Sequence, residues 1–152
     1  MASPVVATTD IARPAEEVFA SATDPTCFTE WQAGVVDGHL DTSEPVRAGA
    51  LCVTSRRIGG ATRSVTSVVT HVDPPRAWGV RGTDGPIRAT VGLIVQPLTD
   101  DSSRLTVSVG FEGLGIGRIL VPVLAGRQAR REMPANIATL KQRVESEQTY
   151  QP

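Results

Sequence analysis

The residue best suited to acid–base chemistry is His71, because an imidazole can titrate near neutral pH. It is one of only two histidines in the chain. On strict alternation along a strand, His71 shares a face with Val65 and Val69. Val68 and Val72 occupy the other face, so the direction of the His71 side chain stays open at this point. A lone histidine on a strand is more often structural or exposed than catalytic.

Arg130 is the second candidate, because it is the one charge on an otherwise apolar stripe. Read backwards from Val144, apolar or small residues recur in steps of three and four, which places them on one face of a helix. These residues are Leu140, Ile137, Met133, Gly126, Val123 and Ile119. A cation on this face meets a buried acid, binds a ligand anion, or leans to the rim while Ala129 packs. The third arrangement is the default expectation, because long cations reach solvent readily.

Other kinds of site find little support in the sequence. No carboxylate cluster accompanies either histidine at ligand spacing, so we expect no metal. Cys27 and Cys52 match no zinc motif and make no disulfide framework. The segment from Gly113 to Gly117 invites a dinucleotide reading, but the third glycine of GxGxxG would fall at Arg118. We therefore expect no cofactor, and interpret these glycines as a tight turn from sheet to helix.

Composition narrows the class of protein further. The 152 residues are 40% hydrophobic and 20% charged, as in an ordinary globular protein. A net charge of −1 and a pI of about 6.1 argue against a dedicated nucleic-acid binder. No apolar run reaches the length of a membrane span, and Met1 to Pro4 lacks the features of a signal peptide. We expect a cytoplasmic protein with one domain over residues 1–147 and a disordered tail over residues 148–152.

The elements that must position these residues follow a clear order. Val5 to Ile11 has strand character, and two short helices follow, beginning at Pro14 and at Asp24. Six further strands joined by tight turns predict an antiparallel sheet. Residues from Gly115 to Glu147 predict one long helix. Period-two alternation implies one buried sheet face, so the fold class is α+β, with a curved antiparallel seven-stranded sheet wrapped around the C-terminal helix.

Several local stretches resemble a known family. They are Ile11 to Phe19, Asp24 to Trp31, Asp73 to Arg76 and Gly85 to Ile87. Together with the order of elements they resemble the helix-grip fold of the START-like (SRPBCC) superfamily, in its polyketide cyclase/dehydrase branch. The resemblance implies a cavity between sheet and C-terminal helix that takes an apolar or amphipathic small molecule. It carries no shared catalytic set.

The favoured hypothesis is therefore binding of a lipid- or polyketide-like small molecule in that cavity. Its expected lining is Phe28, Trp31, Trp78, Phe111, Arg130, Met133 and Ile137. Trp31 is expected to be largely buried at the cavity mouth, because an indole is large and apolar and few other aromatic residues are available to cover that end of the cavity.

Two alternatives stay open. One is a cyclase or dehydratase with His71 as proton carrier and Arg130 as oxyanion anchor, in reach of the substrate. The other is a protein without a small ligand that meets an acidic partner or membrane surface through Arg118, Arg127 and Arg131. We expect no stable membrane insertion, no nucleic acid, and a monomer or homodimer.

Overall fold

The structure is a computed structural model, and it describes residues 4–42, 46–58, 60–120 and 125–147. The strands are β1 (Val5–Ile11), β2 (Val35–Leu40), β3 (Leu51–Ile58), β4 (Ala61–Asp73), β5 (Ala77–Gly82), β6 (Ile87–Thr99) and β7 (Ser102–Gly113). The helices are α1 (Ala15–Thr23), the 3₁₀ turn η1 (Pro25–Cys27), α2 (Phe28–Trp31), α3 (Gly117–Leu120) and α4 (Gly126–Glu147). The predicted tail, residues 148–152, lies outside the described residues.

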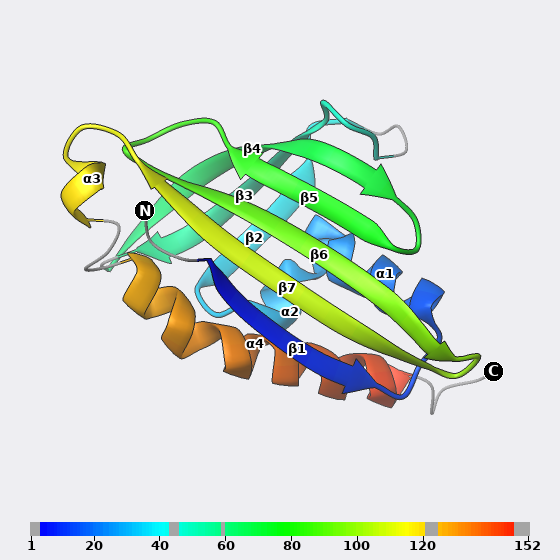
Figure 1. The fold of residues 1–152 in the computed structure, drawn as a ribbon. Coiled ribbons are helices and arrows are strands. Elements are labelled where there is room, and N and C mark those ends of the chain that lie inside the picture. Colours follow the sequence, from blue (N-terminus) through cyan, green and yellow to red (C-terminus); the bar gives the residue numbers. More distant parts are fainter. Residues whose placement is uncertain (1–3, 43–45, 59, 121–124, 148–152) are drawn as a thin grey trace.

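The seven strands form one curved antiparallel sheet in the order β1-β7-β6-β5-β4-β3-β2 (Figure 1). Each strand from β2 to β6 pairs antiparallel with the next strand along the chain, and β1 pairs with β7. Helix α4 runs along β1 and also contacts α1 and α2. This confirms the predicted α+β helix-grip fold.

The first described helical residue of the C-terminal stretch is Gly117, whereas the sequence predicted a helix from Gly115. Helices α3 and α4 both lie within the predicted range, and residues 121–124 between them lie outside the described residues. Gly115 adopts a positive φ of 59°, which ends the extended strand in a turn, and the backbone at Gly117 lies so close to Pro86 that a larger residue would clash. The glycines therefore serve the sheet-to-helix turn, as expected.

The apolar stripe of the C-terminal helix is confirmed within α4. Its buried members are Gly126, Met133, Ile137, Leu140 and Val144. They repeat in steps of three, four and seven, so they share one face and pack into the core. The proposed members Ile119 and Val123 lie where side chains are not described. Among the described helices, none is long and apolar enough to cross a membrane.

The concave face of the sheet is the face that meets the helices. Its fully buried residues include Ile11, Trp78, Leu93, Val95 and Leu105. Their strand partners in register point the same way, so the face can be followed across the sheet. Near the turn between β6 and β7, α1 lies over this face and Val95 and Leu105 are buried, whereas Pro97 at its edge is exposed.

Towards the other end of the same strands, cover is incomplete. Register places Ile87, Ala89 and Phe111 on the concave face, yet each is only half-buried. Val65 on β4 shares this face and is also half-buried. We call this part of the sheet the open end of the concave face. It is where a ligand can gain the most by covering apolar surface.

Candidate functional site

Three aromatic side chains pack together where α2 meets the concave face, and we call them the aromatic floor. Phe28 and Trp31 of α2 meet edge to face, with ring centroids 5.8 Å apart, and Phe28 meets Trp78 of β5 at 6.2 Å. Such perpendicular contacts are favoured by the charge distribution of aromatic rings. All three rings are buried, with Trp31 only 8% exposed, so the predicted burial of Trp31 is confirmed.

Both indole N–H groups in this floor lack an acceptor. The Nε1 atoms of Trp31 and Trp78 are buried, and no described residue accepts a hydrogen bond from either. An unsatisfied buried donor costs about 1–3 kcal/mol. A molecule that brought acceptor oxygens to this floor would remove that cost.

Strand β3 sends polar side chains to the concave face. Cys52, Thr54 and Arg56 alternate with outward residues, and register pairs them with Ser67, Val65 and Arg63 of β4. Cys52 and Thr54 are buried, and Arg56 is half-buried at the open end. Register places Arg63 on the same face, where it is exposed, so Arg56 is the partly buried cation of β3 and β4 on this surface.

The guanidinium of Arg56 is held by neutral groups. Its Nε donates to Oγ1 of Thr54 at 3.2 Å, and its Nη2 donates to Oε1 of Gln32 at 3.1 Å. No carboxylate of the described chain lies within the 4.0 Å of an ion pair, although Glu132 of α4 is near enough to act on it through space. A partly buried charge usually has a charged partner. Here the two hydrogen-bond partners are neutral, so the guanidinium is fixed in place but not neutralised.

Burial shifts the pKa values of Arg56 and of the nearby Cys52. Removal from water lowers the pKa of Arg56, and the nearby Cys52 and Glu132 oppose that shift. Burial also raises the pKa of the Cys52 thiol to about 11, with Arg56 acting against it. The thiol is therefore protonated and a poor nucleophile at neutral pH, while the arginine keeps its charge.

The imidazole of His71, whose direction the sequence left open, faces outward. The register between β4 and β5 shifts between Val69 and His71, so a bulge at Thr70 turns the imidazole to the outer face. There the ring lies over Gly79, and Nδ1 is 3.1 Å from the Thr70 hydroxyl. Strict alternation failed because it cannot anticipate a bulge.

Arg130 follows the default expectation and not the site hypothesis. It is exposed, while the neighbouring Ala129 is half-buried. The side chain leans to the rim of α4, as long cations do. With His71 also exposed, the pair suggested for a cyclase is not assembled on the concave face.

The remaining predicted lining residues lie at different depths. Met133 and Ile137 of α4 are buried in the core, and Phe111 is half-buried at the open end. Their contact with a ligand stays a prediction. Arg56 and Gln32 were not predicted at all. The available signal was that Arg56 shares a strand face with Cys52.

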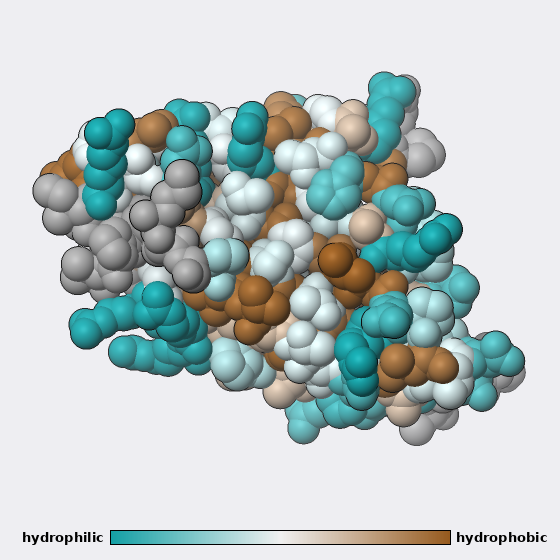
Figure 2. Space-filling model, in the orientation of Figure 1, coloured by the Kyte–Doolittle hydropathy of each residue, from teal (hydrophilic) through white to brown (hydrophobic). Residues whose placement is uncertain are grey.

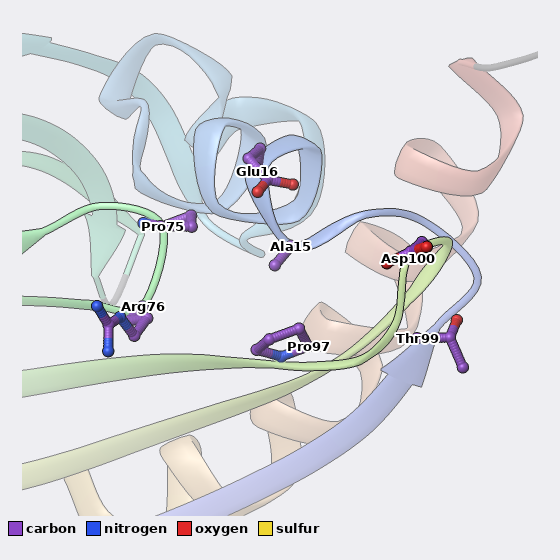
Figure 3. A pocket seen from close by; sticks show the side chains of 7 residues that line it. All are labelled: Ala15, Glu16, Pro75, Arg76, Pro97, Thr99 and Asp100. Atoms are coloured by element: carbon purple, nitrogen blue, oxygen red, sulfur yellow. The ribbon is translucent and has the colours of Figure 1, made fainter.

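A separate pocket of about 320 Å³ lies at the opposite end of the molecule (Figure 3). Its lining comes from the start of α1 and two turns of the sheet, and consists of Ala15, Glu16, Pro75, Arg76, Pro97, Thr99 and Asp100. None of the predicted ligand-binding residues borders it. Three ionisable groups and an open shape make this pocket a poor match for an apolar ligand.

Residues 4–145 match the model of the family described as polyketide cyclase / dehydrase and lipid transport. The chain belongs to this family. The match covers the whole sheet and nearly all of α4. It confirms the family resemblance carried by the local stretches. No curated protein matches the sequence significantly.

Solved structures agree with the family fold. A START superfamily protein from Mycobacterium smegmatis has 19% identity and a TM-score of 0.72, over 94% of this chain and 97% of that one. The Zhui aromatase/cyclase from Streptomyces sp. R1128 has 15% identity and a TM-score of 0.68, over 94% and 93%.

The di-domain aromatase/cyclase BexL of the BE-7585A biosynthetic pathway has 14% identity and a TM-score of 0.75. The match covers 95% of this chain and 47% of BexL, so the chain spans about half of that protein. Likenesses at such low identity establish the fold, and they assign no ligand or reaction to this chain.

Proposed function

We propose that this protein binds an amphipathic small molecule whose apolar body covers the open end of the concave face and whose acidic group meets Arg56. The observation that carries the proposal is the guanidinium held by Thr54 and Gln32 without a carboxylate partner in the described chain. Arginine offers a planar fork of donors that fits a carboxylate or similar anion.

The apolar surroundings support the same ligand class. Ligand sites are mostly apolar with a few placed polar groups. Here Ile87, Ala89 and Phe111 offer half-buried apolar surface, and the indole of Trp31 offers a free donor. A lipid-like or polyketide-like acid, with an apolar body and oxygen acceptors, would use this apolar surface, the Trp31 donor and the Arg56 guanidinium.

We favour binding over catalysis for this site. A dehydratase or cyclase needs a general acid or base within reach of the substrate. Both histidines of the chain, His39 and His71, are exposed, and the Cys52 thiol has a pKa of about 11. An arginine anchors an anion without exchanging protons at neutral pH.

The test uses two fluorescent probes that differ in charge. One is 8-anilinonaphthalene-1-sulfonate, which is aromatic and anionic, and the other is N-phenyl-1-naphthylamine, its neutral counterpart. Because a hydrogen bond to a charged group contributes about 1.5–3 kcal/mol, Arg56→Met should weaken the anionic probe about 10- to 100-fold. The neutral probe should bind almost unchanged.

The matched control is Arg57→Met, which removes the next arginine along β3. Arg57 is exposed and points away from the concave face. It should leave both probe affinities within about twofold, a difference of about 0.4 kcal/mol. Equal losses in the two variants, or no loss in Arg56→Met, would refute the role given to Arg56.

A further inference from the structure

The near-neutral net charge of the chain hides a strong separation of charge. The following segments meet at the open end of the sheet, and we call them the basic end: residues 56–58 with 60–63, 81–88, 111–120 and 126–132. They contain nine of the fifteen basic residues and only three of the sixteen acidic residues. Elsewhere the sequence has six basic and thirteen acidic residues. One end of the molecule is therefore cationic and the remainder anionic.

Backbone contacts join several of these segments. Register pairs Ile87 with Gly113, and the Leu114 amide donates to the Pro86 carbonyl at 2.8 Å. Glu132 near the start of α4 acts through space on the charge of Arg56 in β3. In Figure 1 the tip of the hairpin of β3 and β4, α3 and the start of α4 all lie at the left end.

Most of these cations are free to meet a partner. Seven of the nine are exposed, namely Arg57, Arg63, Arg81, Arg118, Arg127, Arg130 and Arg131. In the described part of the chain none of the seven forms an ion pair. Figure 2 shows hydrophilic side chains projecting from the start of α4, at the lower left.

The basic end also presents apolar side chains to solvent. Ile116 is 66% exposed and Leu114 is 37% exposed, in the turn between β7 and α3. Backbone hydrogen bonds from Gly117 to Leu114 and from Arg118 to Gly115 hold this turn in shape. An exposed isoleucine beside arginines matches a surface that touches lipid, where apolar groups enter the interface and cations meet headgroups.

We propose that the basic end docks reversibly on an anionic lipid surface. This inference goes beyond ligand binding and does not depend on the ligand. The charge fits phosphate-bearing headgroups, and Ile116 gives the contact an apolar component that a nucleic acid would not use. Phe111 is the one aromatic residue of these segments and lies on the concave face, so no aromatic platform for bases is exposed here. Docking would also bring the open end of the concave face to the membrane.

The test measures sedimentation of the full chain with two kinds of vesicle. One contains dioleoylphosphatidylglycerol and dioleoylphosphatidylcholine in equal parts, and the other contains dioleoylphosphatidylcholine alone. We expect binding to the anionic vesicles at about 0.05 M salt, loss at about 0.5 M salt as screening shortens the range of the charges, and no binding to the neutral vesicles. Absence of binding to anionic vesicles at low salt would overturn the proposal.

The variants locate the contact. Arg127→Glu should weaken vesicle binding at least about fivefold, because each basic residue near the surface contributes about that factor. Glutamate is compatible with the first turn of α4, so folding should be retained. Arg76→Glu makes the same change of charge at an exposed position of the opposite end and should have little effect. Equal losses in the two variants would overturn the proposal.

Two further measurements separate the possible explanations. Ile116→Ser should weaken vesicle binding at least about fivefold, because an apolar side chain no longer enters the interface. Affinity for the anionic naphthalene probe should stay unchanged in Arg127→Glu, so that failure of docking and failure of ligand binding are distinguishable. If single-stranded DNA binds with the same dependence on Arg127 while vesicles do not, the surface serves a nucleic acid and the lipid proposal is wrong.

Discussion

The Nη2 atom of Arg56 lies 3.1 Å from Oε1 of Gln32, a contact that joins the inner surface of β3 to the end of α2. The amide orients the guanidinium without neutralising it. The contact therefore keeps a cation available on the concave face while limiting its movement. The first prediction follows from the neutrality of Gln32.

Gln32→Glu should convert this contact into an internal ion pair. The new carboxylate has nearly the shape of the amide, and it would neutralise the guanidinium charge that an acidic ligand needs. We expect affinity for the anionic naphthalene probe to fall at least about tenfold at pH 7, while the neutral probe is unaffected. Fluorescence titration measures both. Unchanged affinity for the anionic probe would show that it does not use Arg56.

Trp31→Ala tests whether the aromatic floor supports the fold or only the ligand. If the ring serves purely as core, the free energy of unfolding should fall by about 3–5 kcal/mol in urea denaturation. A much smaller loss together with weaker probe binding would mark Trp31 as part of the ligand entrance. In a Trp78→Phe background, Trp31 emission should be blue-shifted and resist iodide. Emission at the fully hydrated wavelength would contradict the burial of this ring.

Gly38 is needed for the close approach of η1 to β2. A Cβ at Gly38 would collide with the backbone carbonyl of Pro25, whereas a Cβ at Gly110 of β7 would meet nothing within 4 Å. Gly38→Ala should therefore destabilise by about 1–3 kcal/mol. Gly110→Ala is the control and should be neutral or stabilise by about 0.5–1 kcal/mol, since alanine loses less entropy on folding. Thermal unfolding of both variants decides, and an equal effect would contradict the packing at η1.

Acid should weaken the attachment of the C-terminal helix. The Ala12 amide donates to Oε2 of Glu145 at 2.9 Å, and Lys141 lies 3.0 Å from the same oxygen. These contacts hold the pKa of Glu145 below its ordinary value. A carboxyl with a lowered folded-state pKa stabilises the protein above its unfolded pKa of about 4.3, and that stability is lost as pH falls through the folded value.

Urea unfolding at pH values from about 7 down to about 3 measures this loss. Asp10, whose pKa is lowered by its hydrogen bond with Arg104 at 2.7 Å, adds to the same trend. Glu145→Gln should reduce stability at pH 7 and flatten the dependence on pH. If the free energy of unfolding of the variant depends on pH as steeply as that of the original protein, other groups control the acid transition.

Much of the architecture could be predicted because periodicity reports burial directly. The bounds predicted for β1 are those observed, and the stripe through Met133 and Leu140 identified the buried face of α4. These features depend on local alternation and on helix spacing, which a single sequence contains. The helical start at Gly117, two residues after the predicted Gly115, was missed because the turn that precedes it depends on the close contact of Gly117 with Pro86.

The candidate site was harder to predict, for two physical reasons. The bulge at Thr70 reversed His71, and a bulge leaves no clear mark in the sequence. On β3, Leu51 and Val53 look like the inner face, yet Leu51 is 37% exposed and the concave face carries Arg56. Apolar alternation favours the wrong face wherever a binding surface keeps a polar group inside.

The most direct test follows the two indole N–H signals in a ¹⁵N–¹H correlation spectrum, because the chain has only two tryptophans. Trp31→Phe and Trp78→Phe assign them. On adding 8-anilinonaphthalene-1-sulfonate, we predict strong shifts of the Trp31 indole signal and of the Nε–H signal of Arg56. The Trp78 indole signal should shift less. In Arg56→Met the Trp31 shift should need a higher probe concentration. If the probe binds while none of these signals moves, the concave face is not the ligand site.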